Sequence, residues 1–127
     1  MSWDIVIFNS DQKIISMDEV DESLLRPIDF DSILTKQFKS IILDDHHVEI
    51  KGDDFIIDYF LDDELVSNKM FSLYGERGLY ELVTISKTHN WQIFDTSSEK
   101  MIDFDVPDKN GYQTFQRYLQ QIQRKED

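Results

Sequence analysis

The sequence contains no cysteine, and this absence removes several classes of function at once. Without thiols the chain forms no disulfide, no thiolate metal site and no cysteine nucleophile. No apolar run approaches the length of a membrane span, and the apolar start at residues 5–8 follows Asp4 and is too short for a signal peptide. We therefore expect a cytoplasmic protein, since cysteine-free chains suit a reducing compartment.

Basic side chains are scarce as well. Thirteen Lys and Arg against 26 Asp and Glu give a net charge of −13 at pH 7. Residues 1–64 hold 17 acidic and five basic side chains, net −12, whereas residues 65–127 hold nine and eight, net −1. Such a field repels phosphate backbones and anionic lipids, and it attracts a basic protein surface. The charge thus argues against nucleic acid and membrane as partners and favours a basic protein.

The recognisable catalytic motifs are also missing. The sequence has no nucleophile elbow, no P-loop and no dinucleotide-binding fingerprint, and nothing in it implies a cofactor. What it does hold is apolar material for a core, because 40% of its 127 residues are hydrophobic and nine are Phe. We expect one domain spanning residues 1–127.

The hydrophobic pattern predicts an alternation of strands and helices. Strand-like runs cover residues 3–10, 46–51, 55–61, 69–74, 91–95 and 101–105, and helical spacing covers 28–43, 75–90 and 112–122. The first run is apolar on both faces, so it should lie centrally in a sheet. The order predicts an α+β fold with a ferredoxin-like split β-α-β unit. We expect its mostly antiparallel sheet to be covered by helices, with a further helix at the C-terminus.

The densest group of chemically active residues is DDHHVEIKGDD, residues 44–54. Alternate residues of a strand share a face, so Asp45, His47 and Glu49 form the best candidate trio for a metal-dependent hydrolase. Glu49 and Lys51 also match the acid-x-lysine pair of metal-dependent nucleases, a very unspecific pattern. Acid-rich hairpins arise from turn chemistry without any metal, and we therefore predict no metal site.

Two glycines, Gly75 and Gly78, have the spacing of a backbone-clamping GxxG loop. A tight turn and close packing of a helix on the sheet explain them better in so acidic a chain, although a phosphate at the helix start stays possible. His89, near the end of the same helix, is expected to be structural.

Acidic side chains gather at both ends of the run 55–61. We predict that these residues bind a basic partner, as two patches with one residue between them: Asp53, Asp54, Asp58, Asp62, Asp63 and Glu64.

The segment LYGERGLYELVTISKTHNWQIFDTSSEKMIDFD, together with the start WDIVIF, resembles small bacterial α+β proteins of unassigned function. That resemblance covers about a third of the chain. In size and charge the chain also resembles immunity proteins, which neutralise basic nuclease toxins. The second resemblance implies binding to a cognate toxin and no chemistry of its own.

Our leading interpretation is a non-enzymatic acidic module that binds a basic protein, with an immunity-type inhibitor as one form of it. The alternative is the metal-dependent hydrolase at residues 45–49. A third possibility is an acidic decoy that imitates DNA and occupies a nuclease.

Overall fold

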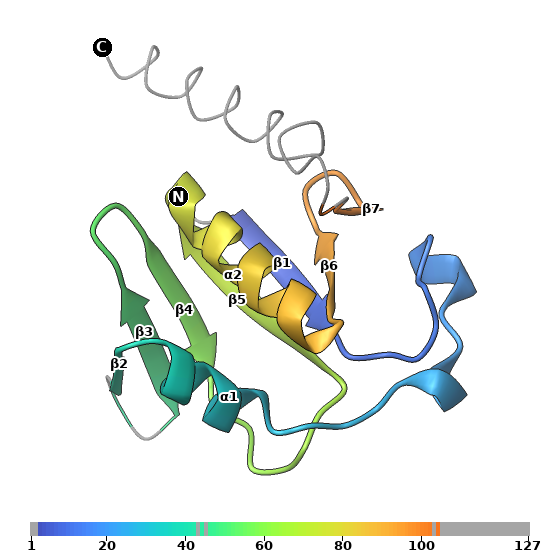
Figure 1. Cartoon of the computed structure of the whole chain (residues 1–127), viewed down its shortest axis with the longest axis horizontal. Helices are drawn as coiled ribbons and strands as arrows, with labels where there is room; N and C mark the ends of the chain where they lie inside the picture. Colours follow the sequence, from blue (N-terminus) through green and yellow to red (C-terminus); the bar gives the residue numbers. More distant parts are fainter. Residues whose placement is uncertain (1–2, 43, 45, 103, 105–127) are drawn as a thin grey trace.

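The computed structural model describes residues 3–42, 44, 46–102 and 104, which form one sheet and two α-helices (Figure 1). In chain order the elements are β1 (Trp3–Phe8), the 3₁₀ turns η1 (Met17–Glu19) and η2 (Glu22–Leu24), α1 (Phe30–Gln37), β2 (Ser40–Ile42), β3 (His47–Lys51), β4 (Ile56–Phe60), β5 (Asn68–Tyr74), α2 (Glu76–His89), β6 (Gln92–Asp95) and β7 (Lys100–Met101).

The sheet has seven strands in the order β2-β3-β4-β5-β1-β6-β7, and each pair of neighbouring strands is antiparallel. β1 lies between β5 and β6, as its two apolar faces predict. The hairpin turn between β3 and β4 is closed by the backbone N–H of Gly52, which donates to the carbonyl of Phe55 at 2.9 Å. Strands β3, β4 and β5 thus form the antiparallel meander expected from the sequence.

The core lies on one side of this sheet, under both α-helices (Figure 1). Alternate residues of each strand point into it, for example Ile5 and Ile7 of β1, which are fully buried. Leu34 of α1 and Leu82 of α2 are also fully buried, because the apolar stripe of each helix faces these strands. Burial alternates along β5 from Lys69 to Leu73, so the opposite side of the sheet is the more exposed one.

The expected α+β class is confirmed, but the sheet order is not the ferredoxin-like one. After β1 the chain passes through residues 9–29 and α1 to the far edge of the sheet, where β2 begins. The short connections that follow keep β2 to β5 adjacent as they return toward β1. The sequence pattern predicted the order of these elements except for β2, and it did not predict that the chain crosses to the far edge of the sheet after β1.

The helix predicted over residues 28–43 was too long. The structure ends α1 at Gln37, and Phe38 already has extended backbone angles. Ser40–Ile42 then form the edge strand β2, paired with Val48–Ile50 of β3. Ile41 and Ile42 are β-branched and favour a strand. Their pairing with β3 stabilises this strand more than the helical spacing of the apolar residues stabilises a longer helix.

The helix boundaries otherwise follow capping chemistry. Asp29 is the N-cap of α1 and accepts hydrogen bonds from the hydroxyl and the backbone N–H of Ser32, at 2.7 and 3.1 Å, which lower the pKa of its carboxyl. Asn90 ends α2 in the left-handed conformation, with φ at 60°.

The helix predicted over 112–122 lies outside the described residues, as do positions 103 and 105 of the predicted strand 101–105. Within the described part of the chain, the helices fall short of the length and apolar character that a membrane crossing needs.

Gly75 joins β5 to α2 in a conformation that other residues rarely adopt, with φ at +97°. A Cβ at this position would lie 2.5 Å from the carbonyl oxygen of Asp54. Gly78 is less constrained, since its Cβ would meet the Cγ1 atom of Ile57 at 3.2 Å. Both expected roles of this glycine pair, a tight turn and close helix–sheet packing, are confirmed.

We predict that Gly75→Ala lowers the free energy of unfolding by about 1–3 kcal/mol, because backbone strain and contact with a fixed carbonyl add up. Gly78→Ala should cost less than about 1 kcal/mol, since better helix propensity offsets the tight contact. Urea unfolding followed by circular dichroism measures both. Equal losses for the two variants would contradict this explanation.

Tyr59 points into the core from β4, and its hydroxyl is buried without a hydrogen-bond partner among the described residues. Burial, with a smaller contribution from the nearby carboxylate of Asp31, raises the pKa of Tyr59 to about 12 from 10.0. The neutral phenol therefore persists in the folded protein at pH values where the unfolded chain is ionised.

This raised pKa predicts a loss of stability at high pH. The contribution of Tyr59 is fully present below about pH 10 and is lost as the pH rises through about 12. Tyr59→Phe should thus reduce the fall in unfolding free energy between pH 9 and 11, measured by urea titration at each pH. An unchanged fall in this variant would show that the phenol is not the responsible group.

Candidate functional site

The side of the sheet turned away from α1 and α2 carries a mixed acidic and apolar surface, which we name the open face. Its residues come from β1, β3, β4 and β5 and include Asp4, Val6, His47, Glu49, Lys51, Ile56, Asp58, Phe60, Met70, Ser72 and Tyr74. Three of them are large and well exposed: Phe60 at 66%, Met70 at 55% and Tyr74 at 40%. Large apolar side chains exposed together on a sheet face are typical of a surface that contacts another molecule.

A row of polar groups crosses the open face from strand to strand. Glu49 of β3 pairs with Asp58 of β4, Asp58 pairs with Ser72 of β5, and Ser72 pairs with Asp4 of β1. The Ser72 hydroxyl donates to Asp4 Oδ1 at 2.8 Å. We name these four residues the acidic row. It places three carboxylates on one face within four neighbouring strands.

Glu49 and Asp58 stand directly opposite each other, and like charges at such positions destabilise a sheet. His47 lies beside this pair, with its Nε2 atom 3.6 Å from Asp58 Oδ1. The His47 ring also stacks on Phe60, with 5.0 Å between ring centroids. Asp58 Oδ1 is nevertheless buried without a hydrogen bond among the described residues, so the acidic row keeps capacity to accept one.

The apolar residues lie on both sides of the acidic row. Ile56 and Tyr74 pair across β4 and β5 on one side, and Val6 and Met70 pair across β1 and β5 on the other. A ligand with a cationic centre and apolar flanks would match this pattern.

The partner-binding residues predicted from the sequence fall in three places. Asp53 and Asp54 are exposed at the turn between β3 and β4, where Asp54 Oδ2 lies 3.6 Å from Arg77 Nη1. Asp63 and Glu64 are exposed in the connection between β4 and β5, at the other end of β4. Asp58 lies between these two patches, as predicted, and belongs to the acidic row.

The sixth predicted residue, Asp62, is engaged within the protein. Its carboxylate forms an ion pair with Lys69, whose side chain is only 4% exposed. Asp31 of α1 approaches the same ammonium group, with 3.1 Å between Oδ1 and Nζ. The carbonyl of Phe60 accepts a further hydrogen bond from Lys69. The Lys69 Nζ atom also lies 5.5 Å from the centroid of the Tyr59 ring. We name Lys69, Asp31 and Asp62 the buried ion cluster.

The metal trio is tested only in part, because Asp45 lies outside the described residues. His47 and Glu49 do share the open face of β3, as the alternation predicts. In the described ranges, however, no group of three or more His, Asp or Glu side chains is placed to hold a metal ion. Asp44 closes the turn before β3: hydrogen bonds from the backbone N–H groups of His46 and His47 lower its pKa.

Sequence reasoning missed Asp4 and Ser72 as members of the candidate site. Both alternate with buried residues of their strands, which is a signal of a shared face. Their proximity to Asp58 depends on strand order and register, however, and these follow from the path of the whole chain.

Comparisons of the chain with models of protein families, with curated proteins and with solved structures give no match. The assignment of a function therefore rests on the site itself.

The buried ion cluster predicts a large effect of removing its cation. Lys69→Met should lower the free energy of unfolding by about 3 kcal/mol, because two partly buried carboxylates lose their partner. Adding Asp31→Asn and Asp62→Asn to this variant should restore part of the loss, since no uncompensated charge remains. Urea unfolding measures all three proteins. A loss below about 1 kcal/mol in the single variant, or no recovery in the triple one, would contradict this role.

Proposed function

We propose that the protein is a non-enzymatic binding module whose open face receives a basic partner protein. The partner would place Lys or Arg side chains against the acidic row and apolar side chains against Phe60, Met70 and Tyr74. Charge-assisted hydrogen bonds to carboxylates supply the specificity of such contacts, and the apolar area adds to the affinity.

The facing pair of Glu49 and Asp58 is the observation that carries this proposal. Two carboxylates opposite each other cost stability, and a partly buried position increases that cost. A cationic partner converts this cost into binding energy, because it neutralises both groups at once. The net charge of −13 adds long-range attraction, which accelerates the encounter with a basic surface.

An immunity-type inhibitor is the form of this function that we favour. A basic nuclease or toxin presents cationic groups around its substrate site, and the acidic row with its flanks would cover them. The cysteine-free sequence supports a cytoplasmic place of action, where such inhibitors protect the cell. The charge of the chain also supports the exclusion of nucleic acid and anionic lipid as direct partners.

The test compares two variants with the same change in charge. Glu49→Gln with Asp58→Asn removes the facing pair, whereas Asp18→Asn with Glu19→Gln removes two exposed charges in η1. Each protein is immobilised and exposed to lysate of the source cells at about 50 and about 200 mM NaCl. These concentrations lie on either side of physiological ionic strength, at which charges are screened over about 8 Å. Bound proteins are identified by mass spectrometry and assayed for nuclease activity with and without the module.

We expect the unaltered protein and the Asp18/Glu19 variant to retain the same basic protein and to inhibit it. The Glu49/Asp58 variant should lose it, while its unfolding free energy rises by roughly 0.2–1 kcal/mol as the repulsion disappears. Retention of the same proteins by both variants would contradict the proposed surface. If no basic protein binds at either salt concentration, the proposed partner class is wrong.

A further inference from the structure

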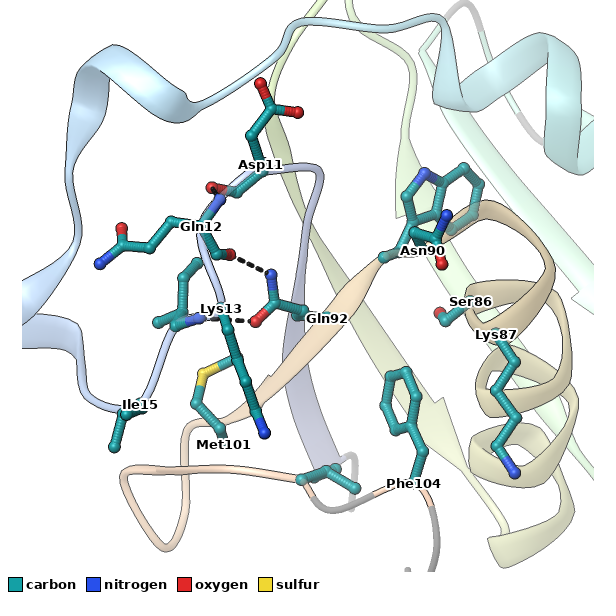
Figure 2. Close-up of a pocket in the computed structure, with 14 residues that line it drawn as sticks. Asp11, Gln12, Lys13, Ile15, Ser86, Lys87, Asn90, Gln92, Met101 and Phe104 are labelled. Atoms are coloured by element: carbon teal, nitrogen blue, oxygen red, sulfur yellow. Dashed lines mark hydrogen bonds between the residues drawn. The ribbon is translucent and has the colours of Figure 1, made fainter.

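A second candidate site lies beside β6, near the edge of the sheet that β7 forms. It is a cavity of about 1000 Å³ between residues 10–15, the C-terminal half of α2, the start of β6 and the three residues Met101, Ile102 and Phe104 (Figure 2). Cavities of this volume are at the upper end of those that hold small organic molecules. The open face contributes no residue to this cavity, so the two sites are independent.

The wall formed by residues 12–14 is fixed to the sheet by a single side chain. The Gln92 amide accepts a hydrogen bond from the backbone N–H of Ile14 and donates one to the carbonyl of Gln12, each at 2.7 Å (Figure 2). Because both polar ends of this amide are satisfied by one loop, the wall is held in place before any ligand arrives. Preorganised walls of this kind reduce the entropy cost of binding.

The lining combines apolar side chains with two lysines. The apolar residues are Ile14, Ile15, Trp91, Met101, Ile102 and Phe104. Lys13 from the loop and Lys87 from α2 stand on opposite sides of the cavity, with Phe104 between them in this view (Figure 2). Ile15 is 73% exposed, which leaves apolar surface at the mouth uncovered.

The charge at this cavity is opposite to that of the protein as a whole. Lys13 and Lys87 are exposed, and neither takes part in an ion pair within the described ranges. The one acidic residue of the lining, Asp11, is already paired with Arg26 at 2.6 Å. A chain of net charge −13 thus leaves two free cations beside an apolar cavity.

Ser86 supplies an independent observation that points to a ligand. It belongs to the lining, its side chain is fully buried, and its hydroxyl has no hydrogen-bond partner among the described residues. Figure 2 shows this hydroxyl on the side of α2 that faces the cavity. A buried hydroxyl without a partner is rare in folded proteins, and a polar group of a ligand would satisfy it.

We propose that this cavity binds a small amphipathic organic anion, with its apolar body among the side chains of Trp91, Met101 and Phe104. The acidic head, a carboxylate or sulfonate, lies between the ammonium groups of Lys13 and Lys87. A polar atom of the body accepts a hydrogen bond from the Ser86 hydroxyl. This site adds a small-molecule ligand to a protein whose open face serves a different partner.

The experiment uses three probes of equal chain length and different charge: decanoate, decanol and decylammonium. Isothermal titration calorimetry on the full chain, below the concentration at which the probes form micelles, measures their affinities. We expect saturable one-to-one binding of decanoate, weaker binding of decanol and the weakest binding of decylammonium. That ranking runs against the net charge, which by itself would favour the cation.

Matched variants locate the site. Lys13→Gln with Lys87→Gln should weaken decanoate binding by about tenfold, because each lysine contributes a charge-assisted contact at an apolar site. Lys36→Gln with Lys39→Gln makes the same change in charge in the last turn of α1 and just after it, at residues that do not line the cavity. This control should alter the affinity by less than about twofold. Circular dichroism establishes that both double variants are folded.

The proposal fails if decanoate does not saturate, if decylammonium binds as tightly as decanoate, or if both double variants lose the same affinity. Displacement of decanoate by 8-anilinonaphthalene-1-sulfonate, with a rise in its fluorescence, would support a shared cavity. The Glu49/Asp58 variant should bind decanoate normally, so failure here leaves the proposed protein partner unaffected.

Discussion

A single buried ammonium group links parts of the chain that are distant in sequence. Lys69 on β5 forms ion pairs with Asp31 of α1 and with Asp62 of the connection between β4 and β5. The backbone carbonyl of Phe60 accepts a further hydrogen bond from its ammonium group. Removing a charge from water is costly, so the cluster persists only because each donor has a partner. The ion pair between Lys69 and Asp31 thus adds to the apolar packing of Phe30 and Leu34, which also holds α1 against the covered face of the sheet.

The acidic side chains of the molecule have two different roles. Asp62 contributes to internal structure, whereas Glu49 and Asp58 face outward without a full set of partners. The surface beside β6 differs again, since Lys13 and Lys87 form no ion pair with any described residue and apolar side chains are gathered around a cavity. Net charge therefore describes the molecule poorly, and the local distribution decides what each surface can bind.

The sequence predicted the local elements well, because their signals are local. The apolar stripe of α2, the left-handed end at Asn90 and the central position of β1 all follow from patterns within a few residues. The edge strand at residues 40–42 was misassigned because its pairing with β3 is not visible in its own spacing. The sequence named Asp58 as a partner-binding residue and Glu49 only as a candidate metal ligand. Asp4 and Ser72 were missed, since they come from strands that meet through the sheet order.

The two ends of the sheet are its shortest strands. β2 spans three residues and β7 two, so each edge offers few unpaired backbone groups to another chain. Long, flat edges act as templates on which further strands add, and short ones limit this growth. Strands add to a sheet at its edges, and both edge strands of this sheet are short. We therefore expect the protein to resist fibril formation in concentrated surroundings even though its open face carries exposed apolar side chains.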